Sequence, residues 1–235
     1  MPSVALVLYA VVVNQARRIP LVLHAAALSQ VIPLLAGARY GFKLPRVRLW
    51  TLAWCLALLA GDGIQLWLRG SAGNNNLWVR AAIVPIHNAI MLWTLSLWQQ
   101  HAVPRLAFRI AIPIFLIAWL ALIPTIQRTG AYDIVAGPFQ SLLLLAGALY
   151  TLVTNAVRDP EQVTQHDWFW ITLGASLYFG FRVALPPFAA TLLPSHPELV
   201  RLAYLLQAWA DIVVFLLIAR GIWCPLPQAR SGGFF

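Results

Sequence analysis

Residues 134–157 read IVAGPFQSLLLLAGALYTLVTNAV, a run that contains no charged side chain. A helix rises about 1.5 Å per residue, so about 20 apolar residues span the hydrocarbon core of a bilayer, which is about 30 Å thick. The run exceeds this length, and it therefore predicts a transmembrane helix.

Six further runs have the same character. Residues 19–38, 81–104 and 110–127 are also free of charge. Residues 49–68, 168–197 and 202–219 each contain one charged side chain, which is Asp62, Arg182 and Asp211, respectively. We therefore predict an all-α fold, a polytopic transmembrane bundle of seven helices.

The composition excludes a water-soluble domain. Of the 235 residues, 61% are hydrophobic and 10% are charged, with a mean hydropathy of +0.77. The formal net charge is +9, but most Lys and Arg residues lie between the apolar runs. This placement indicates topology and contact with anionic lipid headgroups, and we expect no nucleic-acid partner. The single lysine, Lys43, lies between two runs, which excludes a retinal pigment bound through a Schiff base.

The distribution of basic residues predicts the topology. Residues 1–18 hold an apolar run too short to cross, and we interpret them as an interfacial or re-entrant lead-in. Residues 19–223 form the transmembrane domain, and residues 224–235 form a short cytoplasmic tail. Alternate connections carry nine and six basic residues, which places the N-terminus outside and the C-terminus inside. We expect a multi-pass protein of the plasma (inner) membrane.

The charged residues inside the spans are the candidate functional groups. A charge within a bilayer costs about 2.5–3.5 kcal/mol on insertion scales, so such residues face the bundle interior or a water-filled cavity. Polar neighbours accompany them at helical spacing and at similar depth, in the outer half of the bundle. The candidate ligand-binding or proton-relay residues are Asp62, His87, Asn88, Tyr178, Arg182, Tyr204, Gln207 and Asp211. If their helix faces converge, they line a pocket that opens toward the outer face.

Two interpretations of the charges remain open. Arg182 and Asp211 lie on consecutive spans joined by a short turn, so an ion pair between them is expected, and it acts either as a structural tie or as part of a site. Asp62 then lacks a cation and carries a proton, because burial disfavours a charged carboxylate. The alternative is that Asp62 pairs with Arg69 on its own helix, at the outer interface.

Motifs for cofactors and metals are absent from the sequence. Nucleophile elbows, phosphate-binding glycine loops and paired metal motifs do not occur. His24 and His87 fall at comparable depth, but two isolated histidines are more often packing residues than haem ligands. We therefore expect no cofactor and no metal.

A short set of residues resembles the lysoplasmalogenase-like family of small multispan membrane hydrolases. The matching residues are Gly61-Asp62, His87, and Tyr204 with Gln207. The second acidic motif of that family is missing, because residues 174–179 continue into Gly180 and Arg182. The resemblance implies an intramembrane hydrolase as an alternative function, and it does not establish membership.

The leading hypothesis is a small membrane protein that binds a ligand, in the manner of a sensor, or moves a proton or small polar solute through the outward-facing pocket. Its partners are then membrane lipids, a small-molecule ligand of unknown identity and, in the sensor version, another membrane protein. The first alternative is a hydrolase of a lipid-derived substrate, in which a carboxylate acts as general base and His87 assists. The second alternative is a non-catalytic subunit of a larger membrane complex. Whether the chain is an enzyme stays open.

Overall fold

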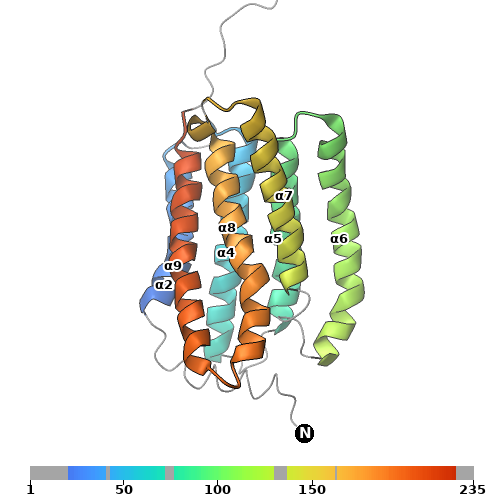
Figure 1. The fold of residues 1–235 in the computed structure, drawn as a ribbon, viewed down its shortest axis with the longest axis vertical. Coiled ribbons are helices and arrows are strands. Elements are labelled where there is room, and N and C mark those ends of the chain that lie inside the picture. Colours follow the sequence, from blue (N-terminus) through green and yellow to red (C-terminus); the bar gives the residue numbers. More distant parts are fainter. Residues whose placement is uncertain (1–20, 41–42, 72–76, 130–136, 162, 226–235) are drawn as a thin grey trace, which may run out of the picture.

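The computed structural model describes residues 21–40, 43–71, 77–129, 137–161 and 163–225. These residues form helices and connections and contain no strand, which confirms the all-α class (Figure 1). The elements are α2 (Leu21–Ser29), α3 (Val31–Ala38), α4 (Arg46–Ser71), α5 (Leu77–Leu97), α6 (Ala102–Thr129), α7 (Gly137–Arg158), the 3₁₀ turn η4 (Val163–Gln165), α8 (Asp167–Leu192) and α9 (Pro197–Ile222).

Six segments of the described chain are long and apolar enough to cross a membrane. They are Leu21–Ala38, Arg46–Gln65, Ala102–Ala121, Gly137–Arg158, Asp167–Leu192 and Pro197–Ile222. In α5, the described apolar part is the shorter Ala82–Leu97. A multi-pass helical bundle follows from these lengths, whereas the count of seven spans and the orientation of the termini stay predictions. The predicted lead-in at residues 1–18 and the tail after residue 225 lie outside the described residues.

The first span is interrupted, which the sequence analysis did not anticipate. Residues 19–38 predicted one helix, but α2 and α3 meet at Gln30. The cause is Pro33, which has no N–H to donate to the carbonyl of Ser29 and whose ring crowds that carbonyl. Gln30 keeps φ −60° and ψ −22°, so the interruption is local and the chain continues in the same direction.

Most helices form a closed ring. Contacts run from α4 to α5, α7, α8 and α9 in turn, and the α2–α3 pair closes the ring against α9 and α4 (Figure 1). Helix α6 stands outside the ring against α5. In Figure 1 the lower end of the bundle is where α4 ends and α5 begins, and the upper end is where α4 begins and α5 ends. These two names are used below.

The apolar core lies inside this ring. Its centre is Trp54 of α4, whose ring lies 5.3 Å from Tyr178, 6.0 Å from Phe179 and 6.4 Å from Phe215, measured between centroids. Trp54 therefore joins α4 to α8 and α9 across the bundle. Met91 and Leu144 extend the core to α5 and α7.

A buried arginine ties the helices together at the upper end. Arg48, only 1% exposed, pairs through Nε with Asp167 Oδ2 at 2.9 Å. Its Nη1 donates to the carbonyl oxygens of Ile222 (3.0 Å) and Cys224 (2.8 Å), and its Nη2 donates to that of Pro225 (3.3 Å). The first of these carbonyls belongs to the last residue of α9 and the other two follow it, at the end of the helix where acceptors are left unsatisfied. From the sequence, Arg48 was interpreted only as a basic residue of a connection. The structure shows that it also joins α4, α8 and α9.

Candidate functional site

A layer of polar side chains borders the apolar core on its lower side. Three of them lie four residues, about one helical turn, from a core residue of the same helix. These pairs are Asp62 with Leu58, His87 with Met91, and Asp211 with Phe215. In each helix the polar member is nearer the lower end than its core partner, so all three lie on the lower side of that partner. We call the full set the polar layer; it comprises Gln30, Asp62, His87, Asn88, Gln140, Tyr178, Arg182 and Asp211.

The ion pair expected from the sequence is present. Arg182 Nη1 of α8 lies 3.1 Å from Asp211 Oδ1 of α9. The guanidinium carbon also lies 3.5 Å from the centroid of the Tyr178 ring, one turn earlier on α8, in a cation–π contact. Tyr178 is buried against Trp54, so Arg182 is held between the core and the carboxylate of Asp211.

Asp62 has a neutral partner in the described residues. Its Oδ2 accepts a hydrogen bond of 2.6 Å from Nε2 of Gln30, the residue at the interruption between α2 and α3. The side chain of Arg69 lies outside the described part, so the alternative pairing of Asp62 with Arg69 stays untested. Sequence reasoning missed Gln30, although a buried amide within an apolar run, three residues before a proline, was a usable signal.

His87 and Asn88 are buried on α5. Asn88 Nδ2 donates to Gln140 Oε1 of α7 at 3.0 Å, a second polar contact that sequence reasoning did not find. Among the described residues, four buried polar atoms of the polar layer and of the adjoining core have no hydrogen-bond partner: Gln30 Oε1, Trp54 Nε1, His87 Nδ1 and Asn88 Oδ1. Buried polar atoms are rarely left without a partner, because desolvation then goes uncompensated.

Electrostatics connect the parts of the layer. The charge of Arg182 interacts through space with both Asp62 and His87, in addition to its direct pair with Asp211. The layer therefore holds one described cation, two carboxylates and one histidine near one another. Such a group of titratable side chains can bind a polar molecule and can hold or release a proton.

The two remaining candidates lie on α9. Tyr204 is 42% exposed and lies about two turns nearer the lower end than Asp211, and Gln207 is partly buried and lies about one turn nearer. Both residues therefore lie between the lower end of α9 and the polar layer, and they are not part of the layer. The sequence candidates thus lie between the middle of the bundle and its lower end, while Gln30 and Gln140 were the members missed.

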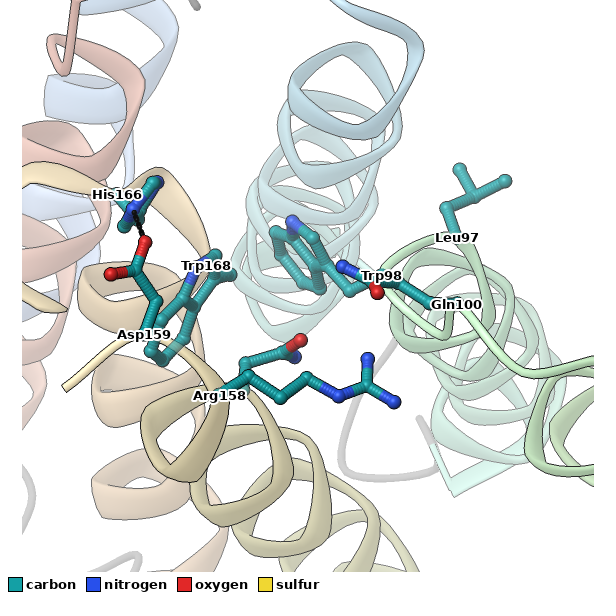
Figure 2. A pocket seen from close by; sticks show the side chains of 8 residues that line it. Leu97, Trp98, Gln100, Arg158, Asp159, His166 and Trp168 are labelled. Atoms are coloured by element: carbon teal, nitrogen blue, oxygen red, sulfur yellow. Dashed lines mark hydrogen bonds and ion pairs between the residues drawn. The ribbon is translucent and has the colours of Figure 1, made fainter.

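A cavity of about 340 Å³ lies at the upper end, far from the polar layer. Trp98, Asn155 and Trp168 form walls of this cavity, which we call the upper cavity (Figure 2). Arg158 and the hydrogen-bonded pair of His166 Nε2 and Asp159 Oδ2, 2.8 Å apart, lie at its rim. The sequence pointed only to a pocket at the other end.

Comparison with protein-family models, curated proteins and solved structures finds no match to this chain. Within the described residues, no group of three or more His, Cys, Asp or Glu side chains is arranged to hold a metal ion. The resemblance to membrane hydrolases and the subunit alternative stay predictions, as does the absence of a cofactor. The function must therefore be argued from the polar layer itself.

Proposed function

We propose that this protein binds a small polar solute in the polar layer and that binding is coupled to protonation of Asp62. The single observation that carries the proposal is a set of four buried polar atoms without a hydrogen-bond partner among the described residues, three of them in the polar layer and one on Trp54 in the adjoining core. The leading hypothesis from the sequence is retained, with a narrower assignment of roles. Transport of that solute is one form of this function.

The ligand is expected to be polar because the four buried atoms without a partner are hydrogen-bond donors and acceptors. Trp54 Nε1 is a donor, Gln30 Oε1 and Asn88 Oδ1 are acceptors, and His87 Nδ1 is either, depending on its tautomer. A molecule with both donors and acceptors satisfies these atoms, whereas an apolar molecule leaves them uncompensated.

Asp62 is the expected proton carrier, and Asp211 is not. Asp211 has its charge compensated by Arg182 at 3.1 Å. Asp62 receives a hydrogen bond from the neutral amide of Gln30, which accommodates either protonation state after a small reorientation. Of the two carboxylates, Asp62 is therefore the one without a direct ion pair in the described residues.

The proposal is tested by comparing wild type with Asp62→Asn and Asp211→Asn. The infrared carbonyl band of a protonated carboxyl group, recorded from about pH 4 to about pH 9, reports the proton directly. We expect a titrating band in wild type and Asp211→Asn that is absent in Asp62→Asn. Loss of the band only in Asp211→Asn would contradict the assignment of roles.

Solute binding is tested separately, by a thermal-shift screen of small polar compounds. A ligand that binds the native state raises Tm, and the rise increases with ligand concentration. We expect the hits to lose their effect in Asn88→Leu and to keep it in Ile86→Ala, a control on the same helix whose side chain is exposed. If no hit depends on Asn88, the ligand is not held in the polar layer.

Transport is distinguished from binding by access. A transporter opens the site to both faces in turn, whereas a sensor opens it to one. Proton or solute flux into sealed liposomes, measured with wild type and Asp62→Asn, separates the two forms. For a sensor form, the output requires another membrane protein.

The orientation belongs to the same proposal. The basic residues of alternate connections, nine against six, support a lower end that faces outside and an upper end that faces the cytoplasm of the plasma (inner) membrane. The polar layer is then reached from outside. Labelling of single cysteines placed in the 193–196 turn, in intact cells, tests the orientation.

A further inference from the structure

We propose that the upper cavity binds the phosphate group of an anionic molecule, with Arg158 as its cation and Trp98 and Trp168 as its walls. This site lies at the opposite end of the bundle from the polar layer, so it does not depend on the function proposed above.

The size and position of the upper cavity suit a headgroup-sized ligand. Its volume of about 340 Å³ falls at the small end of the range of ligand sites, which is roughly 300–1,000 Å³. Gln100 and Arg158 are exposed, so the cavity reaches the surface, while Asn155 is buried at its inner wall. A ligand can therefore enter from the surface and meet polar groups at two depths.

Arg158 is the residue of the cavity that can bind an anion. Arg158 has no ion-pair partner within the described residues, and its guanidinium points away from Asp159 in Figure 2. The carboxylate of Asp159 is turned to His166 instead, at 2.8 Å. The five N–H donors of an arginine suit a phosphate oxygen pair. Asn155 uses one amide N–H for the carbonyl of Thr151 at 2.9 Å, and its second N–H is a further donor.

The surroundings add to this preference. In the described part of the upper end, Asp159 and Glu161 lie in the connection before α8, and Asp167 of α8 is paired with Arg48. Basic side chains outnumber these acidic ones. The basic residues are Arg39, Lys43, Arg46, Arg105, Arg109 and Arg220. Such an end attracts anions and anionic membrane surfaces.

The aromatic walls place the phosphate at the membrane surface. Trp98 follows the last residue of α5, and Trp168 is the second residue of α8, so both indoles lie at the ends of apolar helices. Tryptophan prefers the depth of lipid headgroups. Trp168 is held in place by His166, whose ring stacks on it at 5.9 Å. The shared chemistry is a phosphate ester, which a phospholipid headgroup or a soluble phosphate can supply, and the depth of the indoles favours the phospholipid.

The test measures anion binding by the full chain in nanodiscs of phosphatidylcholine. Native mass spectrometry and Tm are followed as phosphatidylglycerol is added to the bilayer, and in parallel arms as glycerol phosphate or inorganic phosphate is added to the buffer. The variants are Arg158→Gln and, as a matched control, Arg39→Gln, which removes an exposed charge from the same end but outside the cavity.

We expect phosphatidylglycerol to bind wild type and Arg39→Gln equally and to bind Arg158→Gln about tenfold more weakly or worse. A response to the soluble phosphates alone, with the same dependence on Arg158, supports the site and assigns its ligand to the soluble source. Equal losses in both variants would indicate general surface charge and overturn the proposal, as would unchanged binding by Arg158→Gln.

A second variant distinguishes loss of binding from a folding defect in Arg158→Gln. Gln100→Leu removes an exposed amide from the rim without changing charge, and we expect it to weaken binding severalfold at an unchanged Tm in phosphatidylcholine alone. If Gln100→Leu and Arg158→Gln both bind the phosphate normally, the cavity does not hold it.

Discussion

Replacement of Arg48 by leucine is expected to destabilise the bundle strongly. The side chain is 1% exposed, and it joins the carboxylate of Asp167 to three carbonyl oxygens at the end of α9. Loss of one partner of a buried ion pair costs about 3–5 kcal/mol, because the remaining charge stays buried without compensation. The three carbonyls lose their donor at the same time. We take about 3–5 kcal/mol as the expected loss.

The assay is thermal unfolding of the purified protein in a mild detergent, followed by helical circular dichroism. For a chain of this size, 1 kcal/mol corresponds to about 2–4 °C in Tm, so the expected decrease is about 6–20 °C. The control is Arg46→Leu, which removes an exposed arginine two positions earlier in α4. A surface change of this kind is expected to stay within about 0.5 kcal/mol of wild type.

A lysine at position 48 makes the test sharper. Lysine keeps the charge and can pair with Asp167, but it lacks the planar fork that reaches several acceptors at once. Arg48→Lys is therefore expected to lie between wild type and Arg48→Leu. The reasoning would be refuted if Arg48→Leu unfolds at the same temperature as Arg46→Leu, or if lysine restores the full stability of wild type.

Three further predictions concern other contacts. Gly221→Ala is expected to cost about 1–3 kcal/mol in thermal unfolding, because its Cβ would lie 2.6 Å from a side-chain carbon of α8, whereas Gly180→Ala, with nothing within 4 Å, is expected to leave Tm unchanged or higher. Burial raises the pKa of the Cys224 thiol, and Arg220 opposes this shift only in part. Its maleimide labelling, in a background without the other cysteine, should therefore be slower than that of a free thiol at neutral pH and should accelerate as pH rises above about 8.5. A double-mutant cycle of Arg182→Met and Asp211→Leu should give a coupling energy of about 0.5–3 kcal/mol, and additive losses would contradict the ion pair.

The features that sequence reasoning recovered are local in the chain. Apolar runs and their lengths identify the spans, because the bilayer imposes the same requirement on each helix independently. The Arg182–Asp211 pair was also within reach, since a short turn places consecutive helices antiparallel and the two residues are 29 positions apart. The break at Gln30 was missed although Pro33 specifies it, because hydropathy alone ignores the hydrogen bond that a proline removes.

The features that were missed depend on which helices become neighbours. Arg48 contacts Asp167 and Ile222, which lie 119 and 174 residues away along the chain. Gln30 and Asn88 find partners on other helices in the same way. A basic residue at the start of a span, such as Arg48, is interpreted from sequence as a topology signal. Its burial follows only from the packing of the helices in the closed ring. The packing order, rather than any local pattern, decides these contacts.

The two ends of the bundle have different chemical properties, and this difference supports the placement of the proposed solute site. At the upper end, polar groups are matched: Arg48 satisfies the end of α9, and Gln99 bonds to Thr151 while its carbonyl accepts both Nε and Nη2 of Arg105. In the polar layer and on the adjoining Trp54, four buried polar atoms have no hydrogen-bond partner among the described residues, and Gln30 lies where the first span is interrupted. Unsatisfied groups lower the stability of the state that contains them, so a solute that pairs with them is bound with a gain that the matched upper end cannot provide. The upper cavity differs from both of these regions because it reaches the surface. Water can satisfy its hydrogen-bond donors there, and an anion that binds replaces that water.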